Sequence, residues 1–178
     1  DSIRRGLANI WDCSVHAHWG TVETGLGGGV ECPELAGAHL READLLLEGK
    51  IRFMDEVVEL GRSNIDWSGS HIDHHVWKSR PNRFLYITSL AAGYGATGDE
   101  EYAAASRDYI QDWINTHPSG RDWKISEEDN PLNLPIRVGD NVVAARGWLG
   151  TLPYFLDSPA FDEEFVARMV DSIRCQLR

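Results

Sequence analysis

Cysteine and basic residues are both scarce in this sequence of 178 residues. The three cysteines, Cys13, Cys32 and Cys175, are widely spaced and form no Cys-x-x-Cys pair. Such an odd set excludes a full disulfide framework and favours buried or idle thiols, with one Cys13–Cys32 bridge as the alternative. Lysine and arginine total 17 against 28 acidic residues, a formal net charge of −11. Because phosphate binding needs a basic face, nucleic acid is excluded as the main partner.

Long apolar runs are also missing. No run approaches the roughly 20 residues needed to cross a bilayer, so we expect no membrane segment. The first five residues lack the apolar core of a signal peptide. The glycine-rich stretch 25–29 lacks the following Lys-Ser/Thr of a phosphate-binding loop and predicts a flexible connection. What remains is a globular composition, 42% hydrophobic with seven tryptophans.

Apolar residues recur at helical spacing over most of the chain, which predicts an all-α fold. Thr97-Gly98-Asp99 predicts a tight turn, with Gly98 ending one helix and Asp99 capping the next. Such a short connection forces an antiparallel helical hairpin. Residues 51–60 fit either a strand with a turn or another helix. The expected helices cover 33–48, 80–97, 99–117, 139–156 and 159–178.

The pattern divides the chain into an irregular lead-in over 1–40 and a helical domain over 41–178. Pro153 is expected to kink or shorten its helix. The last predicted helix reaches Arg178 without a stop signal, and a helical hairpin buries its apolar face only against neighbours. We therefore expect an incomplete array of helix pairs that continues beyond this segment.

A local basic lining stands out against the acidic average. Lys78, Arg80 and Arg83 lie together, and four more cations follow: Arg121, Lys124, Arg137 and Arg146. Acidic residues crowd elsewhere, over 42–59, 99–112 and 157–171. The separation is compatible with binding an acidic sugar chain, although most charge runs are solvated faces.

A spaced set of Trp, Arg and turn residues carries a resemblance to a known family. The landmarks are Ile65-Asp66-Trp67, Trp77, Asn82-Arg83-Phe84, Leu90-Ala91-Ala92-Gly93-Tyr94, Thr97-Gly98-Asp99, Tyr102, Trp113-Ile114, Pro118, Trp123 and Arg146-Gly147-Trp148. From about residue 43 to 178, the chain resembles the N-terminal helical region of the heparinase II/III-like polysaccharide lyases. The first 40 or so residues lie outside the resemblance.

The resemblance implies an incomplete (α/α) toroid whose parent protein cleaves uronic-acid-containing polysaccharides by β-elimination. That reaction removes the proton next to a carboxylate, which must first be neutralised by hydrogen-bond donors. In the family, the neutralising Asn and the other catalytic residues lie in later helix pairs. The resemblance thus assigns no catalytic residue, metal or cofactor to this segment, which we expect to be inactive alone. It also implies a periplasmic or secreted location.

The predicted substrate contacts are indole, amide and guanidinium groups at the toroid mouth. Indoles in loops can stack on sugar faces, and arginine can pair with uronate or sulfate. These contacts are Trp67, Trp77, Asn82, Arg83, Trp123 and Arg146. Core packing of the indoles and structural salt bridges of the arginines are the competing interpretations.

Histidines and tyrosines are two further groups of candidate site residues. The spacing His71-x-x-His74-His75 lacks the His-Glu-x-x-His pattern of zinc sites and favours a polar loop at the cleft rim. All five tyrosines fall in predicted helices, so core roles are the default. Two alternative functions stay open: a non-catalytic sugar-binding or scaffold module, and a toroid glycosidase using carboxylates among Asp66, Asp73, Asp122 and Asp129.

Overall fold

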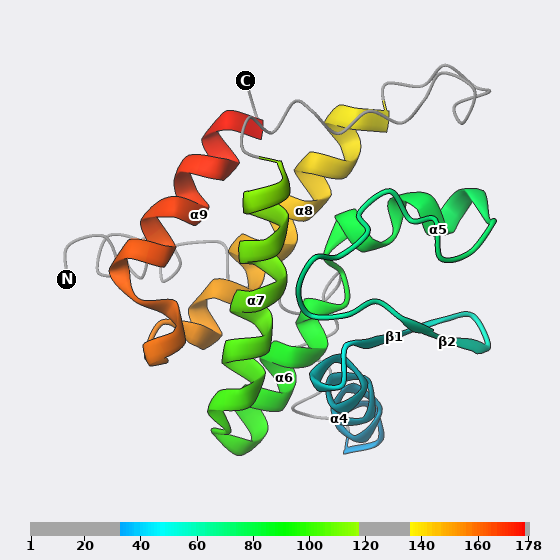
Figure 1. The fold of residues 1–178 in the computed structure, drawn as a ribbon. Helices are drawn as coiled ribbons and strands as arrows, with labels where there is room; N and C mark the ends of the chain where they lie inside the picture. The colour runs from blue at the N-terminus through cyan, green and yellow to red at the C-terminus, as the bar shows by residue number, and fades with distance from the viewer. Residues whose placement is uncertain (1–32, 118–135, 177–178) are drawn as a thin grey trace.

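The structure is a computed structural model that describes residues 33–117 and 136–176. Its element order is α4 (Pro33–Leu47), β1 (Lys50–Phe53), β2 (Glu56–Glu59), α5 (His75–Ser79), η2 (Pro81–Arg83), α6 (Ile87–Thr97), α7 (Glu100–Thr116), α8 (Ile136–Phe155), η4 (Pro159–Phe161) and α9 (Glu163–Gln176). Figure 1 shows α7 and α8 at the centre, with α9 on one side and α5 and the hairpin on the other. The predicted helical fold class is confirmed.

The turn between α6 and α7 forms as the sequence predicts. Gly98 ends α6 in the left-handed conformation with φ of 70°, and its N–H donates to the carbonyl of Tyr94. The Asp99 carboxylate accepts a hydrogen bond from the backbone N–H of Glu101 at 3.0 Å. Glycine avoids the steric cost of this backbone, and aspartate satisfies a free N–H of the first helical turn. The two-residue connection returns α7 against α6.

The ambiguous segment 51–60 forms an antiparallel β-hairpin. Lys50 pairs with Glu59 and Phe53 with Glu56, and Met54 takes a positive φ of 55° at the turn. Ile51, Phe53 and Val58 are buried, whereas Val57 on the second strand is exposed. One face of the hairpin therefore packs on the core, a placement that helical periodicity could not indicate.

Two helix starts differ from the prediction. Pro81 begins only the short 3-10 turn η2, and Phe84 then adopts a left-handed backbone with φ of 54°, so α6 starts at Ile87. Pro159 likewise begins η4, and α9 starts at Glu163 after Asp162, whose carboxylate accepts from the N–H of Phe165 at 2.8 Å. Proline suits the first turn of either helix type, so it could not predict how far each helix runs.

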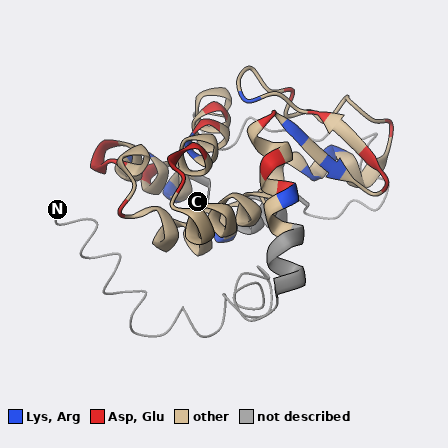
Figure 2. Cartoon of the chain, turned by 90° about the horizontal axis from the view of Figure 1, so that it is seen from below, with Lys and Arg blue, Asp and Glu red and all other residues tan. Residues whose placement is uncertain are grey.

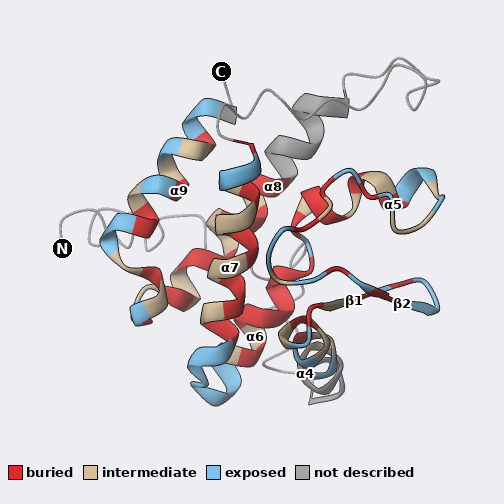
Figure 3. Ribbon diagram, viewed as in Figure 1, coloured by how far each residue is buried: buried red, intermediate tan, exposed pale blue. Residues whose placement is uncertain are grey.

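Many aromatic rings lie in the core, and most of them come from α7, α8, η4, α9 and the segment before α6. Phe84 is fully buried, stacks on Trp67 with 5.4 Å between ring centroids, and meets Trp148 edge to face at 5.2 Å. Figure 3 shows buried residues running through the middle of α6 and α7. Burying one such ring contributes up to about 3 kcal/mol. Pro153 lies within the last turn of α8.

Candidate functional site

The structure places two of the three predicted loop tryptophans in the core. Trp67 is 3% exposed, and its Nε1 donates to Asp112 Oδ2 at 2.9 Å. Trp77 lies in α5, is fully buried, and meets Phe53 edge to face at 5.1 Å. The expectation that these indoles lie at a solvent-facing rim is therefore wrong. Their large apolar surface favours burial, and segment 60–80 folds back over the helices. Trp123 lies outside the described residues.

Asn82 is a buried connector rather than a surface group. It is 2% exposed, and its Nδ2 donates to the backbone carbonyl of Trp67 at 2.8 Å. Its Oδ1 accepts from Nε1 of Trp113 at 3.0 Å. The prediction that Asn82 begins a helix and faces substrate is corrected, because its amide joins two core segments. The amide thereby fixes η2 to the loop before α5 and to α7.

Arg83 and Arg146 are the two predicted contacts that remain partly accessible within the described residues. Arg83 ends η2, and η2 packs on α8, the helix that carries Arg146. A methyl group added at Gly147 would lie 3.3 Å from the carbonyl oxygen of Phe84 and 3.7 Å from that of Arg83. Glycine at this position permits the close approach of α8 to η2. The fold thus brings Arg83 near the residue that follows Arg146.

The loop before α5 is held to α7 by two carboxylates, Asp108 and Asp112, which no sequence motif indicated. Asp112 on α7 accepts from the backbone N–H groups of Asn64 at 2.7 Å and Ile65 at 3.2 Å, besides the indole of Trp67. A nearby ion pair joins Arg62 to Asp108. Asp112 belongs to an acidic run that predicts a solvated face. The one sequence feature that could have indicated this role is the position of Asp112 beside Trp113, on the half-buried side of α7.

Asp66 organises the next stretch of the same loop. Its carboxylate accepts backbone and hydroxyl hydrogen bonds from Ser68 and Ser70. Burial alone would raise the pKa of Asp66, but these hydrogen bonds outweigh it and lower the pKa from 3.8 to about 2. The carboxylate is therefore charged at neutral pH and committed to the loop.

The core tyrosines are poorly suited to remove a proton from substrate. Burial, then the charges of Tyr109 and Asp112, raises the pKa of Tyr86 well above its usual value. Burial and the hydrogen bond to Asp44 raise the pKa of Tyr102 to about 12. A phenol that holds its proton this firmly is almost wholly protonated at neutral pH, so it is not available to accept a proton from substrate.

The histidine loop does not assemble a cation site in this structure. His74 and His75 stack with 4.7 Å between ring centroids, and His74 also meets Phe53 at 5.4 Å. Within residues 33–117 and 136–176, no three His, Cys, Asp or Glu side chains are grouped so that they could hold a metal ion. Over the same residues, no helix combines the length and apolar character needed to span a bilayer.

Acidic residues mark the ends of several helices, in keeping with the net charge (Figure 2). The cations Lys78, Arg80 and Arg83 lie instead along α5, η2 and the residue that joins them, and η2 packs on α8. The helical body thus presents a local basic segment within an acidic molecule, an arrangement that can attract an anionic group to one place.

Comparison with known proteins identifies the family. Residues 40–177 match the family model described as "Heparinase II/III N-terminus", and the chain belongs to this family of polysaccharide lyases. A heparin-sulfate lyase of Pedobacter heparinus is 28% identical over 115 residues, which are 61% of this chain. The match spans only 16% of that relative's length. No solved structure matches.

Proposed function

We propose that this chain is the N-terminal helical segment of a lyase that cleaves uronic-acid-containing polysaccharides by β-elimination. Residues 41–178 would form part of an (α/α) toroid, continued by further helix pairs that supply the catalytic groups. The observation that carries the proposal is the family match over residues 40–177. The heparin-sulfate lyase relative favours a heparan-sulfate-like substrate over other uronates.

Within this segment, the role left to the described residues is binding. Arg83 and Arg146 would pair with carboxylate or sulfo groups, because guanidinium presents two parallel donors that match these oxygens. Asn82 would act indirectly, by fixing η2 to α7 through Trp113. Trp123 remains a proposed stacking residue. The segment alone would bind polysaccharide weakly and would not cleave it.

The test is an elimination assay on the full-length protein with heparan sulfate, hyaluronan and alginate. β-Elimination creates an unsaturated uronate that absorbs in the ultraviolet, whereas hydrolysis creates reducing ends without that absorbance. Absorbing products from at least one polymer are expected. New reducing ends without absorbance would replace the proposal with a glycosidase, and binding without cleavage would replace it with a carbohydrate-binding module.

Arg83→Gln and Arg146→Gln test the assigned contacts. Each should raise KM for the cleaved polymer about tenfold, as expected for loss of a hydrogen bond to a charged group. Arg174→Gln is the matched control, because Arg174 is an exposed cation near the end of α9. Unchanged KM in both variants, with intact melting temperatures, would remove Arg83 and Arg146 from the site.

A further inference from the structure

Arg80 differs from most arginines of the described chain in its electrostatic surroundings. Arg52, Arg62 and Arg107 each form an ion pair with a carboxylate. Arg80 forms none within the residues that the structure describes, although the molecule carries an excess of eleven negative charges. Its guanidinium is half-buried and lies 6.0 Å from the centre of the Phe53 ring. The ring holds the cation in place without neutralising it.

Buried nitrogens without partners lie in the same stretch of chain. Seven buried side-chain polar atoms lack a hydrogen bond in the described chain, and three of them fall within ten residues: His71 Nδ1, Trp77 Nε1 and Arg80 Nε. Phe53 and Trp77 are 5.1 Å apart, and Trp77 and His71 are 5.8 Å apart, between ring centroids. Leaving one such group unpaired costs about 1 to 3 kcal/mol. These nitrogens are themselves too buried to touch a ligand, but they show that the described chain supplies this cluster, Arg80 included, with no hydrogen-bond acceptor.

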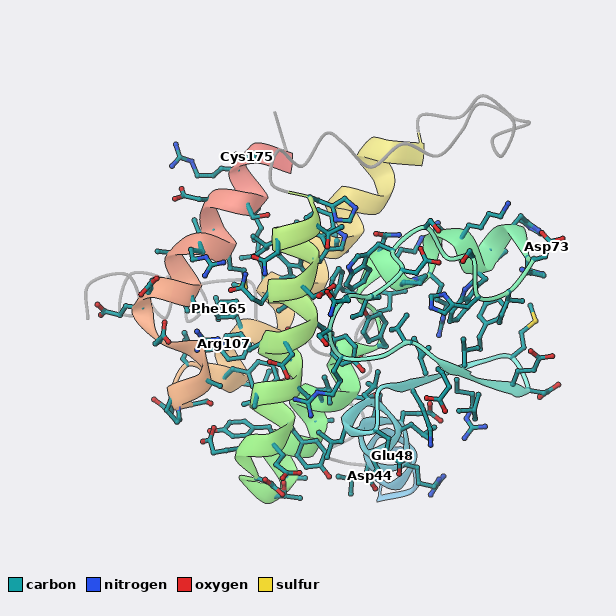
Figure 4. All side chains as sticks on the ribbon, in the orientation of Figure 1. Asp44, Glu48, Asp73, Arg107, Phe165 and Cys175 are labelled. Atoms are coloured by element: carbon teal, nitrogen blue, oxygen red, sulfur yellow. The ribbon has the colours of Figure 1, made fainter. Side chains whose placement is uncertain are left out.

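The backbone places Arg80 next to the proposed substrate contact. Arg83 donates its N–H to the carbonyl of Arg80 at 3.2 Å, which closes the 3-10 turn η2. Residues three apart in a 3-10 helix lie on the same side, about 6 Å apart along the axis. Arg80 and Arg83 therefore share one side of the turn. Asp73, which precedes α5 in the sequence, lies at the outer edge of the molecule and points away from the body (Figure 4).

We propose that the partly exposed guanidinium of Arg80 forms a second anion subsite beside Arg83. Its ligand is a sulfo or carboxylate group on the same polysaccharide chain, so the ligand's identity depends on the proposed function. Both groups offer oxygens that can accept from the guanidinium fork. Two guanidinium groups one 3-10 turn apart would hold successive anionic groups and fix the register of the sugar chain.

The experiment measures binding by calorimetry, without turnover, in the full-length protein. The probes are a heparan sulfate oligosaccharide and a hyaluronan oligosaccharide of equal length, which carries carboxylates but no sulfo groups. The variants are Arg80→Gln, which removes the charge, and Arg80→Lys, which keeps the charge but loses the fork. Arg174→Gln is the matched control. Melting temperatures verify that each variant is folded.

Arg80→Gln should weaken binding about tenfold, Arg80→Lys less, and Arg174→Gln not at all. Loss with heparan sulfate alone identifies a sulfo group, and equal loss with both probes identifies a carboxylate. If Arg80→Gln fails to fold, the affinity of Arg80→Lys is measured instead. An unchanged affinity of Arg80→Lys for both probes then overturns the subsite. Unchanged affinity in folded Arg80→Gln overturns it as well, while elimination activity would still support the lyase. Conversely, an Arg80-dependent affinity without elimination would keep the subsite and overturn the lyase.

Discussion

Asn82 accepts a hydrogen bond from the indole nitrogen of Trp113 at 3.0 Å, across 31 positions of sequence. The same amide donates to the carbonyl of Trp67, so one buried side chain joins the loop before α5, the turn η2 and helix α7. Arg83 at the end of η2, and Arg80 just before η2, lie next to this junction. The position of the basic segment thus depends on a buried polar link.

Asn82→Ala should destabilise the protein by about 3 kcal/mol, because it leaves a buried carbonyl and a buried indole N–H without partners. Urea unfolding measures the change. Asn115→Ala is the control, since Asn115 is exposed near the end of α7, and it should shift stability by less than about 0.5 kcal/mol. Equal effects of the two variants would contradict a structural role for the buried amide.

Gly69→Ala should cost more than Gly98→Ala, although both glycines have positive φ, 72° and 70°. A methyl group at Gly69 would lie 2.7 Å from the Cα of Lys78, whereas nothing lies within 4 Å at Gly98. We expect about 1 kcal/mol for Gly98→Ala from the left-handed backbone alone, and about 3 kcal/mol for Gly69→Ala. Thermal or urea unfolding compares them. Similar losses would show that the approach of the loop to α5 is not tight.

Arg107→Met should loosen the contact between α7 and α9. The Arg107 guanidinium donates to the carbonyl of Ala160 at 2.7 Å and to Asp162 at 2.9 Å, and it lies 4.9 Å from the centre of the Phe165 ring. Its loss should cost about 1 to 2 kcal/mol, since the ion pair itself is partly exposed. Arg174→Met, which removes an exposed pair within α9, should change stability little. A loss confined to Arg174→Met would refute this assignment.

Asp66 predicts a specific acid dependence. Its folded pKa of about 2 lies below the ordinary 3.8, so its contribution is complete above pH of about 4 and is lost as pH falls towards about 2. Asp66→Asn removes the titrating group. The stability difference between the parent protein and this variant should shrink as urea unfolding is repeated at decreasing pH through that window. A difference that stays constant with pH would show that the Ser68 and Ser70 hydrogen bonds do not depend on the charge.

Several features could be predicted from local sequence because their causes are local. Helical periodicity indicated α4, α7 and α8, and Gly98 with Asp99 predicted the turn between α6 and α7. Backbone preference and capping act within a few residues, so the pattern alone is sufficient. The spaced Trp and Arg landmarks likewise predicted the family, which the match over residues 40–177 confirmed.

Tertiary structure alone decided which side chains face solvent in the irregular segments. Trp67, Trp77 and Asn82 follow no periodic pattern, and their burial depends on partners such as Asp112, Phe53 and Trp113 from distant segments. The hairpin and the late start of α6 have the same origin, since Phe84 accepts a left-handed backbone while its ring enters the core. Apolar periodicity determined that the protein is helical, and its net charge determined that it is acidic. The spacing of Lys78, Arg80 and Arg83 determined that it has a basic segment. Among the described residues, long-range packing determined that the four indoles are buried while Arg83 and Arg146 stay partly accessible. Exposing an apolar ring to water costs free energy, whereas an arginine can bury its stem and keep its charged head in water.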